Sequence, residues 1–153
     1  MRGSPVKAAE QGIVLLENNG ILPLKAGKQR ILVVGYNAEN DLAYLGSYCG
    51  TPKAFCKVTE AVKQENPDTD YVQGYSYNLK ENEQLQQQAL EKGEEYDLIL
   101  FCSGLDCSFE GEQAGELLQG GGGMLGEQGD RQTLGLPDVQ LELFRKLCTL
   151  NKK

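Results

Sequence analysis

Apolar and polar positions form alternating blocks along this chain of 153 residues, and the blocks predict helices and strands in turn. Two strands, at 31–35 and 96–102, are predicted by the continuous apolar runs 31–34 and 98–102, which are typical of strands covered on both faces of a parallel sheet. A weaker run at 70–75 predicts a third strand. Apolar positions at helical spacing predict four helices, at 4–18, 58–65, 78 or 80 to 92, and 137–150.

The order of these elements is helix, strand, helix, strand, helix, strand, helix. Such alternation predicts the α/β class, with a layered, mostly parallel sheet flanked by helices as an α/β sandwich. Three strands make a thin sheet, and the chain stops at 151–153, a polar turn after which another strand should begin. We therefore expect residues 1–153 to form a single domain that is incomplete at its C-terminus.

The apolar positions of the first and last helices indicate which faces are buried. In the first helix the partial apolar face includes Ile13, Val14 and Leu16, and Asn18 begins the stop signal. In the last helix five apolar residues recur at helical spacing and predict core positions: Val139, Leu143, Phe144, Leu147 and Leu150. By contrast, the glutamine run 86–88 predicts a solvated helix surface.

A long segment without helical or strand periodicity follows the strand at 96–102. It runs from Gly104 to Pro137 and is rich in carboxylates, namely Asp106, Glu110, Glu112, Glu116, Glu127 and Asp130. One interpretation is a solvated acidic surface loop. The other is a functional loop, since ligands bind beyond the carboxyl ends of parallel strands and loops this long are uncommon in compact domains. The length favours function, and the glycine run 120–123 predicts that residues 113–128 are mobile or extended away from the sheet.

Composition excludes several kinds of chemistry. The formal net charge of −7 argues against nucleic acid and against an anionic membrane surface as partners. The chain contains no histidine, which removes zinc-finger spacings and the Ser–His and Cys–His nucleophile pairs. No G-x-G-x-x-G follows the strand at 31–35, so no nucleotide fingerprint is present. We expect no metal and no cofactor, and acid–base chemistry must rest on carboxylates, Tyr, Lys or Cys.

The five cysteines point to structural roles. Their number is odd, and none forms a C-x-x-C pair. Cys102 and Cys148 fall at apolar positions of a strand and a helix, which predicts buried thiols. This pattern favours a reducing compartment, and therefore the cytoplasm.

Five blocks of the sequence, in order, resemble the C-terminal α/β domain of glycoside hydrolase family 3. They are AAEQGIVLLENNGILPLK (8–25), ILVVGYNA (31–38), LGSYCGTP (45–52), DLILFCSGLDCSFEGEQ (97–113) and GDRQTLGLPDVQLELF (129–144). The family contains β-glucosidases and β-xylosidases. The resemblance implies that a preceding (β/α)₈ barrel, absent from this chain, carries the aspartate nucleophile, while this domain supplies an acid/base glutamate from a loop.

Carried over to this sequence, the resemblance assigns the acid/base to Glu112, with Glu110 as the alternative. Asp130 and Arg131 match a G-D-R element that closes the loop, with a mainly structural role. A retaining glycosidase needs only two carboxylates, in agreement with the composition. The implied substrates are oligosaccharides or β-glycosides ending in β-linked glucose or xylose. The rival interpretation is a non-catalytic, flavodoxin-like binding module. In either case an exposed sheet edge would favour association.

Overall fold

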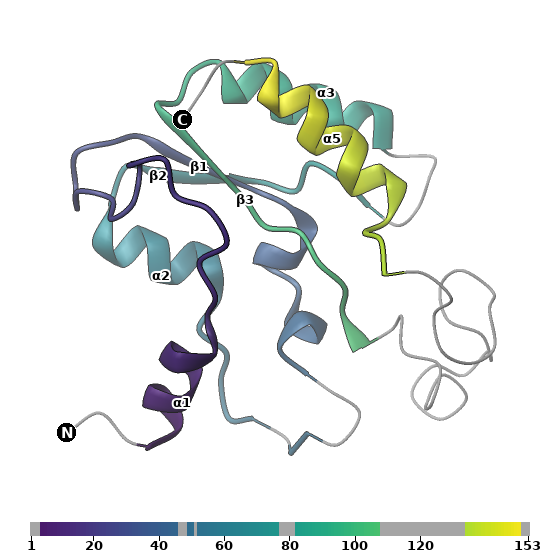
Figure 1. The fold of residues 1–153 in the computed structure, drawn as a ribbon. Helices are drawn as coiled ribbons and strands as arrows, with labels where there is room; N and C mark the ends of the chain where they lie inside the picture. The colour runs from purple at the N-terminus through teal and green to yellow at the C-terminus, as the bar shows by residue number, and fades with distance from the viewer. Residues whose placement is uncertain (1–3, 46–48, 51, 77–81, 108–133, 151–153) are drawn as a thin grey trace, which may run out of the picture.

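The described residues form a three-stranded parallel sheet between two layers of helices (Figure 1). The computed structural model describes residues 4–45, 49–50, 52–76, 82–107 and 134–150. Within them the elements are α1 (Ser4–Gly12), β1 (Ile31–Val34), η1 (Tyr36–Ala38), η2 (Asp41–Tyr44), α2 (Val58–Glu65), β2 (Thr69–Val72), α3 (Asn82–Gly93), β3 (Leu98–Phe101) and α5 (Asp138–Cys148). The predicted α/β class is confirmed.

The most deeply buried strand lies at the centre of the sheet. The strand order is β2-β1-β3, and Ile31 of β1 is in register with Thr69 on one side and Leu98 on the other. All four residues of β1 are buried. A central parallel strand has helices over both faces, which is why the ILVV sequence shows no polar alternation.

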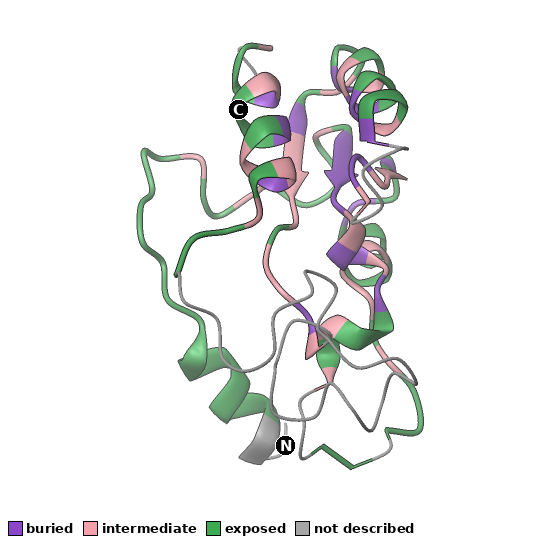
Figure 2. Ribbon diagram, turned by 90° about the vertical axis from the view of Figure 1, so that its right-hand side faces the viewer, coloured by how far each residue is buried: buried purple, intermediate pink, exposed green. Residues whose placement is uncertain are grey.

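Each face of the sheet has its own apolar cluster. Leu32 and Val34 face α3 and α5, which lie side by side on one face, whereas Ile31 and Val33 face α2 on the other (Figure 1). The first cluster is completed by Tyr75, Ala89, Leu143 and Leu147, and the second by Ala38 and Leu98. Figure 2 shows the contrast between this buried centre and the exposed N-terminal helix.

The first predicted helix is shorter than its sequence suggested. α1 ends at Gly12, and the four apolar residues that follow are 62–92% exposed: Ile13, Val14, Leu15 and Leu16. Short helices gain most of their stability from tertiary packing, and the described residues offer this segment no apolar surface to cover. The predicted partial apolar face at 13–16 is therefore wrong for the chain as it stands.

Three smaller predictions also need correction. Gln86, expected at a solvated surface, is buried and accepts a hydrogen bond from Lys146 Nζ at 2.7 Å. Phe144, expected in the core, is 48% exposed. The strand predicted to reach residue 75 ends at Val72, because Gly74 has a φ of +72° and turns the backbone out of the sheet.

Candidate functional site

The candidate site lies at the carboxyl end of the sheet, where the connections after β1 and β3 leave in different directions. The backbone after β1 passes through η1 and η2 toward α2, whereas the backbone after β3 leads toward α5 on the opposite face (Figure 1). Such a point, where successive connections diverge, is where open α/β sheets bind ligands. At this end Cys102 N–H still donates to Val34 O at 2.7 Å, which extends the β1–β3 pairing by one residue.

Gly104 is held by a buried glutamine from the other end of the long segment. Gln140, in the first turn of α5, has no solvent exposure. Its Oε1 accepts a hydrogen bond from Gly104 N at 3.0 Å, and its Nε2 donates to Gly104 O at 2.7 Å. One side chain therefore satisfies both backbone groups of the residue at which the segment begins.

Asp106 is held from the opposite side by the connection after β1. Its carboxylate accepts a hydrogen bond from Asn40 Nδ2 at 2.5 Å, and both side chains are buried. Asn40 also accepts from Leu42 N at 3.1 Å, which caps η2. The sequence placed Asp106 among the carboxylates of an open loop, but this one is a buried anchor.

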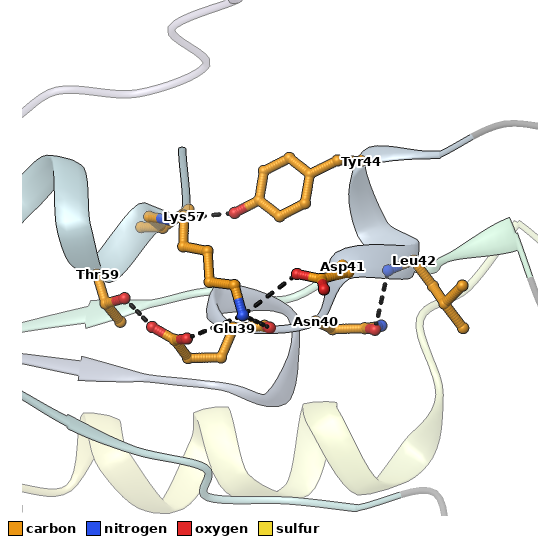
Figure 3. A network of polar contacts seen from close by, with 8 residues as sticks. Glu39, Asn40, Asp41, Leu42, Tyr44, Lys57 and Thr59 are labelled. Carbon is orange, nitrogen blue, oxygen red and sulfur yellow. Dashed lines mark hydrogen bonds and ion pairs between the residues drawn. The ribbon is translucent and has the colours of Figure 1, made fainter. Parts of the chain in front are cut away.

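A network of charged side chains fixes η2 against the start of α2 (Figure 3). Lys57 Nζ lies 3.2 Å from Asp41 Oδ1 and 3.4 Å from Glu39 Oε2, and donates to Glu39 O. The hydrogen bond to Asp41 is the main cause of the raised pKa of Lys57. Glu39 accepts a further hydrogen bond from Thr59. These contacts hold the connection in place.

Tyr44 belongs to this connection and has a packing role. Its hydroxyl accepts a hydrogen bond from Val58 N at 3.1 Å, and its ring lies 5.6 Å from that of Phe55, centroid to centroid. The other tyrosine of the segment, Tyr48, lies outside the described residues. Tyr44 therefore packs within the connection between β1 and α2.

Cys102, directly after β3, is not suited to act as a nucleophile at neutral pH. Burial raises the pKa of the Cys102 thiol to about 11, which keeps it protonated at neutral pH. Cys102 is only partly buried, although burial was predicted, and Cys148 is exposed, so its predicted burial is wrong. α5 presents Leu143 and Leu147 to the sheet, and Cys148 follows on the outer side.

The predicted catalytic residues lie outside the described part of the chain. Glu110 and Glu112 fall in the range 108–133, as do Glu116, Glu127, Asp130 and Arg131. The segment 113–128, expected to be mobile or extended away from the sheet, falls in the same range. The described residues contain no group of three or more Cys, Asp or Glu side chains suited to hold a metal. They also contain no helix long and apolar enough to cross a bilayer.

Sequence reasoning missed Asn40 and Gln140, although each left a signal. Gln140 interrupts the apolar stripe of its helix, three residues before Leu143 and seven before Leu147. A polar residue on a buried stripe must find a hydrogen-bond partner. Asn40 directly precedes a short helical turn, which is a favoured position for a capping asparagine.

Comparison with known proteins defines the class to which this fold and site belong. The model of the glycosyl hydrolase family 3 C-terminal domain matches residues 13–153, and the chain belongs to that family. It is 31% identical over 146 residues to a probable exo-1,4-beta-xylosidase of Neosartorya fischeri, and 30% identical over 149 residues to the exo-1,4-beta-xylosidase of Aspergillus oryzae. Each match covers 95% of this chain but only 17% of the relative.

Solved structures give the same result. A GH3 exo-beta-xylosidase in complex with a xylobiose aziridine activity-based probe superimposes with a TM-score of 0.75 at 26% identity, over 95% of this chain and 17% of the other. A β-glucosidase of Erythrobacter marinus gives a TM-score of 0.73 at 28% identity, over 99% of this chain and 23% of the other. The arrangement of β1, β2 and β3 with their helices is thus that of glycosidase domains.

Proposed function

We propose that this chain acts as part of a retaining β-glycosidase that removes terminal β-linked xylose or glucose units from oligosaccharides. The observation that carries the proposal is membership of the family over residues 13–153, with relatives named as β-xylosidases and β-glucosidases. The same match favours a glycosidase over a flavodoxin-like binding module. Because the chain spans 17% of its curated relatives, the remaining parts of the site belong to sequence outside it.

The proposed contribution of this chain is the general acid/base, at Glu112 or, as the alternative, Glu110. A retaining mechanism requires a nucleophilic carboxylate about 5–5.5 Å from the acid/base. A (β/α)₈ barrel domain joined to this one would supply it. The acid/base must be protonated at the start of the reaction, so burial or the neighbouring carboxylate must raise its pKa. After the leaving group departs, the same residue deprotonates the attacking water.

The contacts at the start of the segment support the proposal that this chain supplies the acid/base. Gly104 and Asp106 are fixed to Gln140 and Asn40, two side chains on different elements. Catalytic groups on loops need rigid supports, because effective catalysis depends on a well-defined geometry. An ordinary solvated loop would not need two buried polar anchors within three residues.

The test is to extend the reading frame and assay the longer protein. We expect an upstream (β/α)₈ barrel with an aspartate at the end of a strand, and turnover of aryl β-xylosides or β-glucosides with retention of anomeric configuration. A reading frame without such a barrel, or a product of inverted configuration, would contradict the proposal.

A further inference from the structure

Asn19 is the only asparagine of the chain that is followed by glycine. Asparagine is among the chemically labile residues of proteins. The peptide nitrogen of the next residue can attack the side-chain amide of an asparagine, and glycine hinders this attack least because it has no Cβ. The sequence therefore favours spontaneous chemistry at residues 19 and 20.

The pair lies in an exposed turn between the N-terminal helix and the sheet. Residues 13–20 are all exposed, so water and hydroxide can reach the Asn19 amide. The φ of Gly20 is +95°, a region that residues with a Cβ rarely adopt, and a Cβ built on Gly20 would meet no described atom within 4 Å. The glycine is thus needed for its backbone angle, and packing does not shield it.

The side chain of Asn18 holds this turn with hydrogen bonds. Its Oδ1 accepts from Gly20 N and from Leu22 N, each at 3.1 Å, and its Nδ2 donates to Leu22 O at 3.0 Å. The first of these bonds uses the same nitrogen that would attack Asn19. To attack, that nitrogen must lose its proton, and a nitrogen anion facing the lone pairs of Asn18 Oδ1 is disfavoured. The contact therefore opposes the reaction that the sequence favours.

We propose that Asn19 is a site of spontaneous deamidation whose rate is limited by the side chain of Asn18. In the reaction Gly20 N loses its proton and bonds to Asn19 Cγ, the Cγ–Nδ2 bond breaks, and Nδ2 leaves as ammonia. Water then opens the resulting succinimide at one of its two carbonyl groups. The products are aspartate and isoaspartate, and water is the only co-reactant.

Deamidation would alter the link between the exposed N-terminal residues and the sheet. The apolar residues 13–16 precede the turn and are exposed, whereas Ile21 follows it and packs against the apolar cluster that includes Val33. Isoaspartate adds one methylene group to the backbone at position 19, and the succinimide has no N–H to donate to Asn18. We therefore expect the N-terminal residues to shift relative to Ile21.

The first test compares the folded and the unfolded chain. The purified protein is incubated at mildly alkaline pH with and without urea, and conversion at Asn19 is followed by mass spectrometry of its peptides. We expect conversion in the folded protein, and conversion at least about threefold faster in urea, where the hydrogen bonds of Asn18 are lost. Absence of conversion in the folded protein would overturn the site, and equal rates would overturn its control by the turn.

The second test removes the Asn18 side chain from the folded protein. Asn18→Ala loses its three side-chain hydrogen bonds but keeps the Asn19–Gly20 pair. One hydrogen bond of this kind shifts an equilibrium by about 2- to 10-fold, so we expect deamidation at Asn19 to be faster by at least about threefold.

The matched control for this variant is Glu17→Gln. It changes an exposed neighbour and leaves the Asn18 side chain in place, so the rate should stay within about twofold of the parent, because exposed charges are screened. Anion-exchange chromatography provides a second readout, since each product carries one negative charge more than its starting protein. Equal rates in Asn18→Ala and Glu17→Gln would overturn the role of Asn18.

A conservative variant isolates the bond to Gly20 N and covers the case in which Asn18→Ala does not fold. The carboxylate of Asn18→Asp can still accept from Gly20 N and Leu22 N, but it cannot donate to Leu22 O. Its negative charge also disfavours an anion at the neighbouring nitrogen. We expect deamidation at Asn19 to be no faster than in the parent. An increase of about threefold or more would contradict the proposal, because the acceptor would then not limit the reaction.

Discussion

Gly35 and Cys102 approach each other more closely than any residue with a side chain would allow. A Cβ built on Gly35 would lie 2.1 Å from the Cys102 carbonyl oxygen, and the φ of Gly35 is +133°. The Cys102 oxygen accepts a hydrogen bond from the Tyr75 hydroxyl at 3.1 Å, so it has a fixed direction. The ends of β1 and β3 are therefore in close contact at the carboxyl end of the sheet, where the candidate site lies.

Substitution of Gly35 by alanine should strongly destabilise the fold. The added methyl group meets backbone, which cannot rotate away, and the residue must also adopt a disfavoured φ. We expect a loss of about 3 kcal/mol or more in the free energy of unfolding, measured by urea denaturation. The control is Gly12→Ala, where no atom lies within 4 Å of the built Cβ. A loss smaller than that caused by an ordinary surface substitution would contradict this prediction, because it would show that the backbone shifts to make room for the methyl group.

Replacement of Glu112 by alanine in the longer glycosidase should reduce kcat far more than replacement of Glu116 or Glu127. General acid–base assistance contributes about 10²–10⁴-fold, and the loss should be smallest for leaving groups that depart without a proton. Kinetics on a series of aryl glycosides measures this dependence. If Glu110→Ala showed the leaving-group pattern and Glu112→Ala did not, the acid/base would be Glu110.

We expect the pKa of the Tyr96 hydroxyl to depend on Asp70. These residues lie beside a cavity of about 350 Å³ at the amino end of the sheet, where Asp70 also pairs with Lys92 at 3.1 Å. The hydrogen bond to Asp70 raises the pKa of Tyr96 to about 12, whereas burial raises that of Tyr71 to about 12. In Asp70→Asn, spectrophotometric titration should show the pKa of Tyr96 moving toward 10 and that of Tyr71 unchanged. Movement of both, or of neither, would contradict these causes.

The hydrogen bond between Tyr96 and Asp70 makes a small contribution to stability. The pH range of this contribution follows from the pKa values of the two groups. Because the pKa of Tyr96 is raised in the folded state, its contribution is fully present below pH 10 and is lost as the pH rises through about 12. The pKa of Asp70 is lowered, chiefly by the hydrogen bond from Tyr96, so its contribution is lost on the acid side as its carboxyl is protonated. The Asp70 side chain is 49% exposed, and solvent screening keeps the effect small. Tyr96→Phe should flatten the alkaline limb of the stability curve.

The chain alone should not hydrolyse aryl β-xylosides or β-glucosides. It offers at most one carboxylate of the required pair, and general acid assistance alone falls far short of the acceleration expected of an enzyme.

We also expect the chain alone to associate, through the exposed residues 13–16 and the outer edges of β2 and β3. A turnover assay with size-exclusion chromatography tests both expectations, and Leu16→Lys should shift the protein toward monomer more than Leu134→Lys. Measurable turnover by a clean monomer would contradict both.

The sequence alone determined the class of fold, because its signals are local. The apolar run 31–34 can be stable only as a strand with helices on both faces, and the helical spacing of Val139, Leu143 and Leu147 fixes the inner face of α5. The five motif blocks likewise pointed to glycoside hydrolase family 3, which the match over 13–153 confirmed.

Tertiary structure decided which polar residues serve the site. Asp106 and Glu112 belong to the same acidic stretch of sequence, yet Asp106 is a buried partner of Asn40, 66 positions away in the chain. Gln140 meets Gly104 across 36 positions, and nothing in the local sequence around either residue encodes that pairing. Hydrogen bonds between distant residues depend on how the layers stack, whereas strand and helix formation depends on neighbours. For the same reason the apolar residues 13–16 continued a helix in the sequence pattern but lie exposed after Gly12, because a helix needs a surface to pack against.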